Sequence, residues 1–159
     1  MESTQQLEIK AGLQVLKPIA DVFDAIVDPD KMKNYFISKS SGYMKEGETV
    51  IWQFPEMEAE FPVRIGKINN NTYISYYWND FADNTKTFVE INLTETEPGA
   101  TFIRVTEKSR PNDEAGIEWV KRNTEGWANF LVCLKAWVEY GINLRKGAFT
   151  LSQMPKKQN

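Results

Sequence analysis

The stretch GWANFLVCLKAWVEYG, residues 126–141, decides the fold because its apolar residues fit one side of a helix. Lys135 and Glu139 fall on the other side, four residues apart. The large apolar side chains recur at the i, i+3, i+4, i+7 spacing of an amphipathic helix, and they are Trp127, Phe130, Leu131, Leu134, Trp137 and Val138. So large an apolar stripe has to be covered by the rest of the chain. It is either ordinary core or also one wall of a ligand cavity.

Composition limits the classes of protein to which the chain can belong. Its 159 residues fit one domain that buries roughly 70% of the surface of the unfolded chain without help from disulfides or metals. The chain has no histidine and a single cysteine, Cys133, which excludes histidine metal sites, Ser-His and Cys-His nucleophile pairs and a disulfide scaffold. We therefore expect no metal and no cofactor, and we interpret Cys133 as a small buried side chain.

Charge and hydropathy limit the partners. The 19 basic and 22 acidic residues are mixed along the chain, with a formal net charge of −3, so no basic stripe for nucleic acid is present. No stretch approaches the length of a membrane span, and the N-terminus lacks the apolar core of a signal peptide. We expect a cytoplasmic protein with no nucleic-acid partner and no membrane span.

The first part of the chain predicts a strand and two short helices. Alternating apolar residues indicate a half-buried strand over residues 5–16. Pro18 fits the first turn of the first helix. Asp28 and Pro29 fit the N-cap and first residue of the second, which we expect to end near Phe36. A loop rich in serine and glycine follows.

From about residue 42 to 109 the sequence predicts short strands. Apolar and polar residues alternate between turn signals such as residues 69–71, which is typical of an antiparallel meander. Residues 111–113 break the sheet, because they combine proline, asparagine and aspartate. We then expect a short separate helix over residues 114–122 and a long helix over about 123–145.

These elements predict one α+β domain over residues 1–159, with its core at about 7–145 and a frayed tail at 147–159. A sheet with one apolar face and a helix with one apolar stripe cover each other. The right-handed twist of strands curls such a sheet around the helix. We therefore expect a curved antiparallel sheet of about six or seven strands wrapped around a long C-terminal helix, with two short helices after the first strand.

The order of several motifs resembles START-like (SRPBCC) domains over roughly residues 7–145. The opening of these domains is similar to KPIADVFDAI, then DPDKM, then the aromatic pair YF, all within residues 17–36. Further similar segments are ISYYW at 74–78, PGAT at 98–101 and EGWANFLVCLK at 125–135. The most similar branch is the one related to the activator of the ninety-kilodalton heat-shock protein ATPase.

The resemblance implies the helix-grip fold, in which a cavity lies between the curved sheet and the C-terminal helix. Members of the superfamily bind lipids, sterols, polyketides or other apolar molecules there. Some members are enzymes, and some are co-chaperone modules. Two positions differ from the family: Tyr35 replaces a tryptophan, and Glu107 replaces the histidine that often ends the last strand.

We expect the cavity to be lined by inward-facing side chains, and we assign no catalytic or metal-binding residue. Tyr76 and Trp78 are the most informative, because each has a polar tip that needs a partner when buried. The alternative is that the same side chains form an ordinary core. The predicted lining residues are Phe36, Trp52, Phe54, Val63, Ile65, Ile74, Tyr76, Trp78, Val89, Ile91, Ile103, Val105, Glu107, Trp127, Phe130, Leu131 and Leu134.

Three acidic residues have two interpretations each. Glu107 continues the inward face of its strand, where a buried carboxylate would mark a functional site. We favour a strand that ends at Thr106 and leaves Glu107 at the wet rim. Asp80 and Asp83 lie in a loop near the expected mouth of the cavity, and we favour a solvated loop over contact with a polar ligand.

The sequence thus supports a module that binds a small hydrophobic or amphipathic molecule, such as a lipid, in its cavity. The alternative is a protein-interaction module that acts on a chaperone, the heat-shock ATPase. A ligand binder should hold a pocket, whereas an interaction module should have a filled core and an exposed apolar or charged patch. A cofactor-free cyclase- or hydrolase-like enzyme is less favoured, because no set of acid and base groups converges in the sequence.

Overall fold

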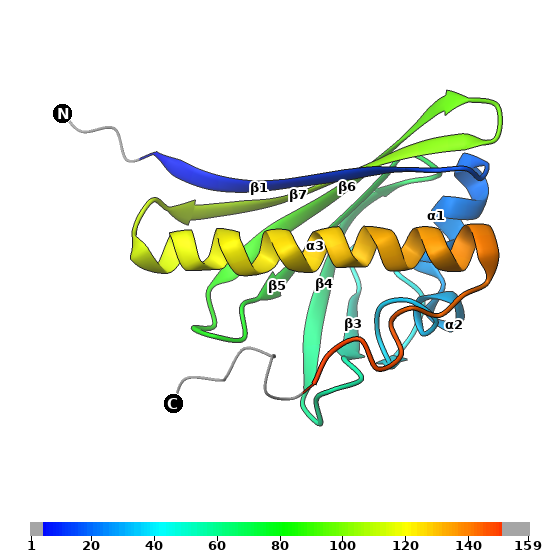
Figure 1. The fold of residues 1–159 in the computed structure, drawn as a ribbon. Coiled ribbons are helices and arrows are strands. Elements are labelled where there is room, and N and C mark those ends of the chain that lie inside the picture. Colours follow the sequence, from blue (N-terminus) through cyan, green and yellow to red (C-terminus); the bar gives the residue numbers. More distant parts are fainter. Residues whose placement is uncertain (1–4, 151–159) are drawn as a thin grey trace.

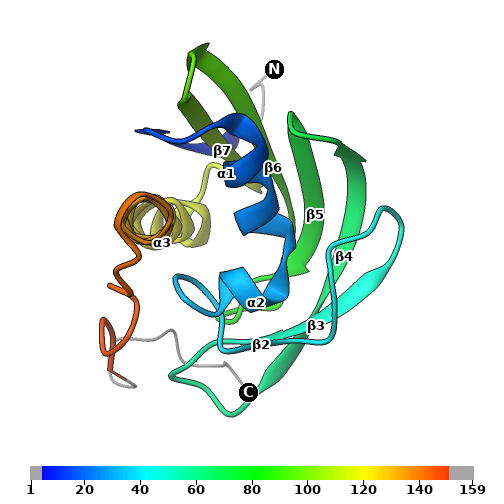
Figure 2. The same cartoon turned by 90° about the vertical axis from the view of Figure 1, so that its right-hand side faces the viewer.

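The computed structural model describes residues 5–150 and shows an α+β helix-grip fold. One antiparallel sheet in the order β1-β7-β6-β5-β4-β3-β2 curves around a long helix (Figures 1 and 2). The strands are β1 (Gln6–Val15), β2 (Lys39–Ser40), β3 (Thr49–Gln53), β4 (Glu60–Asn69), β5 (Tyr73–Asn79), β6 (Lys86–Glu97) and β7 (Ala100–Pro111). The helices are α1 (Ile19–Val27), α2 (Pro29–Met32) and α3 (Glu114–Tyr140). Among residues 5–150, no helix is both long enough and apolar enough to span a bilayer.

Helix α3 is continuous, so the prediction of a separate helix over residues 114–122 is wrong. Asp113 caps its start, since Oδ1 accepts a hydrogen bond from the backbone N–H of Gly116 at 2.8 Å. The apolar stripe continues backwards through Trp119, which is fully buried, and this packing carries the helix across Gly126. The helix ends at Gly141 in the left-handed conformation (φ 68°), before the predicted residue 145.

Both short helices begin close to where they were predicted, but α2 ends earlier than predicted. Asp28 caps α2 by accepting from the backbone N–H of Asp30 at 2.9 Å, and Pro29 is its first residue. Helix α2 ends at Met32, and turns rather than a helix lead on to Phe36. The predicted loop that follows contains β2, which pairs with β3.

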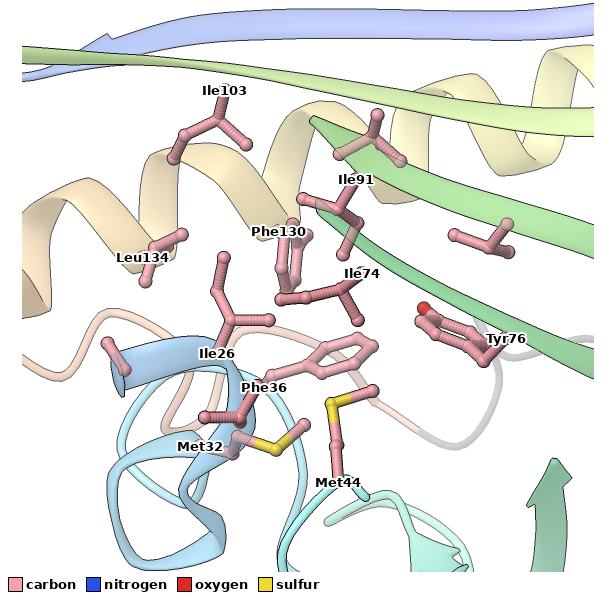
Figure 3. Close-up of a cluster of buried hydrophobic side chains, with 14 of the residues drawn as sticks. Ile26, Met32, Phe36, Met44, Ile74, Tyr76, Ile91, Ile103, Phe130 and Leu134 are labelled. Carbon is pink, nitrogen blue, oxygen red and sulfur yellow. The ribbon is translucent and has the colours of Figure 1, made fainter. Parts of the chain in front are cut away.

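The concave face of the sheet holds the core. Along β4, buried Val63 and Ile65 alternate with exposed Arg64, and Arg104 on β7 is likewise exposed. Helices α1 and α2 fill much of the space between this face and α3, as Figure 3 shows for Ile26 among its neighbours. The buried side chains therefore form one cluster with contributions from the sheet and all three helices.

The polar face of α3 is attached to the edge strand β1. Lys135 Nζ donates to the backbone carbonyl of Gln14 at 2.8 Å, and Glu139 Oε1 accepts from the backbone N–H of Leu16 at 3.1 Å. Lys135 and Glu139 also form an ion pair at 2.7 Å. These contacts fix one flank of α3 to the sheet, while the other flank faces the ends of β3 and β5.

The continuity of α3 can be tested with two glycine substitutions in the same helix. A Cβ at Gly126 meets no atom within 4 Å, so Gly126→Ala should raise the free energy of unfolding by about 1 kcal/mol. A Cβ at Gly116 would lie 2.1 Å from the carbonyl oxygen of Pro111, so Gly116→Ala should lower the free energy of unfolding by about 2 kcal/mol. Urea unfolding followed by circular dichroism measures both. Destabilisation by Gly126→Ala would contradict a single helix.

Candidate functional site

A cavity of about 720 Å³ lies beside α3, between the ends of β3 and β5 and the segment that follows α3. This volume is within the range of about 300–1,000 Å³ that is typical of small-molecule sites. Its polar lining residues include Asp80, Arg122, Glu125 and Arg145. Its aromatic lining residues are Tyr35, Phe36, Phe54, Trp78, Phe81, Trp127, Phe130 and Phe149. The cavity therefore presents mainly ring surfaces, with charged groups among them.

The structure places five of the predicted lining residues at this cavity: Phe36, Phe54, Trp78, Trp127 and Phe130. The others lie away from it because α1 and α2 occupy the centre of the concave face and displace the cavity to one side of α3. Those residues are Trp52, Val63, Ile65, Ile74, Tyr76, Val89, Ile91, Ile103, Val105, Glu107, Leu131 and Leu134. Most of them belong to the packed core, and Figure 3 shows several of these side chains pointing into it.

Glu107 is buried, with 1% of its surface exposed, so the favoured prediction of a wet rim is wrong. Strand β7 continues to Pro111, and Glu107 pairs with Ile9 of β1 on one side and Val89 of β6 on the other. The position is therefore inside the sheet. β7 ends at Pro111, in agreement with the sheet break expected at residues 111–113, because proline is tolerated at the last position of a strand.

The Glu107 carboxylate accepts four hydrogen bonds. Oε2 accepts from Trp78 Nε1 at 2.8 Å and from Thr87 Oγ1 at 2.6 Å. Oε1 accepts from Trp127 Nε1 at 2.9 Å and from Asn123 Nδ2 at 3.0 Å. These donors come from β5, β6 and α3, so one side chain of β7 joins four elements. A buried charge is tolerated when its acceptor sites are satisfied in this way.

The same carboxylate orients two indoles of the cavity wall. Trp78 and Trp127 donate to different oxygens of Glu107, and their ring centroids lie 5.6 Å apart with planes inclined by 32°. Both tryptophans line the cavity, whereas Glu107 lies behind them. Glu107 is therefore a positioning residue that fixes the wall.

Tyr76 lacks the partner that its polar tip was expected to have. Its ring is buried against Trp52, with centroids 5.4 Å apart, and no hydrogen-bond partner for its hydroxyl is found among residues 5–150. Burial, and secondarily the charge of Glu107, raises the pKa of Tyr76 well above its ordinary value. The phenol is therefore neutral at physiological pH.

The loop between β5 and β6 is held by two arginines, so the favoured prediction of a solvated loop is wrong for Asp80. The Asp80 side chain is 3% exposed and forms an ion pair with Arg122 of α3. Arg110 of β7 donates to Asp83 Oδ1 at 3.3 Å. Partial burial acts to raise the pKa of Asp83, but hydrogen bonds from Arg110 and Thr85 hold it below its ordinary value.

The segment after α3 folds back and completes the cavity. Arg145 is buried and binds both carboxylate oxygens of Glu56, with Nη2 to Oε2 at 2.7 Å. The Phe149 ring centroid lies 4.8 Å from Arg145 Cζ, and Ala148 and Phe149 both line the cavity. Two residues of the predicted frayed tail thus form part of the wall, whereas its last part, 151–159, lies outside the described residues.

Cys133 is buried as predicted and also lines the cavity. Burial raises the pKa of its thiol, although the nearby Arg145 charge acts in the opposite direction. A raised pKa leaves little thiolate at neutral pH, so Cys133 is a poor nucleophile. Within residues 5–150, the structure brings together no group of acidic and cysteine side chains that could hold a metal ion.

Comparison with known proteins identifies the family. Residues 17–139 match the family described as "Activator of Hsp90 ATPase homolog 1-like protein". The chain belongs to this family. The match extends from α1 almost to the end of α3, so it includes most of the elements that build the cavity.

Several solved structures share the fold of this chain. The protein SSP2350 from Staphylococcus saprophyticus is 30% identical, with a TM-score of 0.76 over 87% of this chain and 96% of that one. The Aha1 dimer from Colwellia psychrerythraea has the same fold at 19% identity, with a TM-score of 0.71 over 85% of this chain and 98% of that one. DynU16, a putative protein in the dynemicin biosynthetic locus, gives a TM-score of 0.75 at 19% identity over 86% of this chain and 48% of that one. No curated protein matches the chain significantly.

The role of Glu107 can be tested by Glu107→Gln. The amide nitrogen of glutamine cannot accept from the donors that now bind one carboxylate oxygen, so the free energy of unfolding should fall by about 2 kcal/mol. Glu95→Gln, on the exposed end of β6, is the matched control and should change it by less than about 0.5 kcal/mol. Equal effects of the two substitutions in urea unfolding would show that Glu107 is not a buried acceptor.

Proposed function

We propose that this protein binds a small apolar or amphipathic molecule in the cavity beside α3. The supporting observation is the cavity itself: about 720 Å³ lined mainly by aromatic rings, in a domain whose other apolar side chains are closely packed. Ligand sites are concave and mostly apolar, with a few placed polar groups, and this cavity fits that description.

The cavity wall is held in place without a ligand. Phe36 packs edge-on against Phe130 with centroids 4.7 Å apart and against Phe54 at 5.5 Å. Glu107 fixes the two indoles, and Arg145 holds the C-terminal segment through Glu56. A preformed wall lowers the entropic cost of binding, because few side chains have to be ordered by the ligand.

Catalysis is not part of this proposal. Among the described lining residues, Asp80 is engaged by Arg122, and Arg145 is engaged by Glu56. Glu125 is the remaining carboxylate of the wall, and the structure shows no second acid or base bonded to it. An acid and base pair in mutual reach, which acid–base chemistry requires, is therefore not assembled there.

A second candidate function, action on a chaperone, is favoured by a different surface. Four large apolar side chains are exposed near the end of α3, and we call them the α3-end patch: Leu16 (53% exposed), Tyr140 (70%), Ile142 (51%) and Leu144 (47%). Exposed apolar patches often mark protein contacts. The family description names an Hsp90 ATPase activator homologue, and the patch is a surface on which such contact could occur.

A cavity-filling substitution tests the ligand-binding proposal. Asn129 lines the cavity, whereas Val132, one turn further along α3, is 50% exposed and points away from it. Asn129→Phe should reduce uptake of the neutral fluorescent probe N-phenyl-1-naphthylamine by about tenfold or more, because the added ring occupies the site. Val132→Phe should leave uptake unchanged. Equal uptake by both variants would place binding elsewhere and count against the cavity.

The second candidate predicts a different result. A Tyr140→Ser, Ile142→Ser double variant should abolish stimulation of Hsp90 ATP hydrolysis if the α3-end patch is the contact, whereas Asn129→Phe should preserve it. ATP turnover by Hsp90 with each purified variant measures this. Absence of any stimulation by the unmodified protein would remove the second candidate.

A further inference from the structure

We propose that the ligand of this cavity is an organic cation, that is, a molecule with an apolar body and one ammonium-type positive charge. The inference rests on the proposed function and specifies the charge of the molecule bound. It follows from the balance of charges at the cavity and from the orientation of the aromatic wall.

The positive charges of the wall are already neutralised. Arg122 forms an ion pair with Asp80, and Arg145 binds both oxygens of Glu56, whose side chain is 7% exposed. An anion that displaced Glu56 from Arg145 would leave that carboxylate buried without a partner. Breaking such a buried pair is strongly unfavourable.

The negative charges are not all neutralised. Glu125 lines the cavity from α3, and within residues 5–150 it makes no ion pair. Glu107 lies directly behind the wall and is bound by four neutral donors, with no lysine or arginine of the described chain paired to it. Four carboxylates and two guanidinium groups lie at and behind the wall, a formal charge of −2: Glu56, Asp80, Glu107 and Glu125 against Arg122 and Arg145. Arg110 also lies 3.9 Å from Asp80, but it is paired with Asp83, so the two together leave this sum unchanged.

The aromatic wall adds to this negative potential. The face of an indole attracts a cation, and tryptophan is the strongest of the aromatic side chains in this respect. Trp78 and Trp127 donate their N–H groups to Glu107 at 2.8 and 2.9 Å, so the carboxylate charge lies at the edge of both rings. In a buried setting of low dielectric this charge is weakly screened. A cation against these rings gains from the ring faces and from Glu107 together.

An apolar body completes the match. Phe36, Phe54 and Phe130 provide ring surfaces next to the two indoles, with Phe36 and Trp127 centroids 6.4 Å apart. Several aromatic rings that face one cavity form the kind of cage that recognises quaternary ammonium groups. A carboxylate or sulfate ligand of the same shape would lie near Glu107 and Glu125, neither of which is paired with a cationic side chain within residues 5–150. Repulsion between like charges disfavours such a ligand.

Three probes with the same ring test the inference. They are (2-naphthylmethyl)trimethylammonium, 2-naphthylmethanol and 2-naphthylacetate, and calorimetric titration at low ionic strength measures each dissociation constant. The ammonium probe should bind about tenfold tighter than the alcohol, and the acetate should bind weakest. Added salt should reduce the difference in affinity between the ammonium probe and the alcohol, because the Glu125 charge is at the exposed edge of the site and is screened there.

Two variants of α3 distinguish the effect of a charge at the cavity from the effect of the net charge of the protein. Glu125→Gln should weaken binding of the ammonium probe by about threefold and leave binding of the alcohol unchanged. Glu118→Gln removes the same charge from an exposed site of the helix that does not line the cavity, and it should leave both probes unchanged. A purely structural effect of the Glu125 substitution would weaken both probes equally.

The outcomes separate the two proposals. If the alcohol or the acetate binds as tightly as the ammonium probe, the cation assignment is wrong and the ligand-binding proposal stands. If none of the three probes binds to protein that is folded by circular dichroism, and the neutral fluorescent probe is not taken up either, the ligand-binding proposal fails and the cation assignment fails with it.

Discussion

The structure depends on one buried carboxylate. Glu107 accepts hydrogen bonds from Trp78, Thr87, Asn123 and Trp127, and so joins three strands of the sheet to the long helix. An unpaired charge at this depth would be costly, so the packing of the helix on the sheet has to bring donors to this carboxylate. The same requirement fixes the two indoles, and through them the shape of the cavity wall. Fold stability and site geometry therefore rest on the same contacts.

The position of the cavity follows from how α3 is held. On one flank, Lys135 and Glu139 attach the helix to the edge strand β1. At the centre, α1 and α2 lie between the sheet and α3 (Figure 2), and their apolar side chains pack into the core (Figure 3). Space remains on the other flank, where Arg145 and Glu56 close the wall. The cavity is therefore displaced to one side and rich in aromatic rings, and it does not extend along the whole helix.

The sequence predicted the fold because its signals are local. The apolar stripe of α3, the alternation in β1 and the Asp28-Pro29 cap each depend on residues a few positions apart. The site was predicted only in part. Glu107 was misplaced because the alternation of apolar and polar residues does not fix where a strand ends, and β7 runs on past Thr106 to Pro111. The Arg145 and Glu56 pair joins residues 89 positions apart, and nothing in one sequence indicates such a pairing. The extent to which α1 and α2 fill the sheet also depends on packing in three dimensions, so most predicted lining residues became core.

The central claim is that the cavity beside α3 holds a small molecule. Native mass spectrometry of the purified protein, compared with its denatured mass, tests this most directly. The account predicts a discrete excess mass that is lost on denaturation, or a one-to-one adduct when a small aromatic cation is added. A native mass equal to that of the chain alone, with no adduct from cationic, neutral or anionic aromatic molecules, would contradict it.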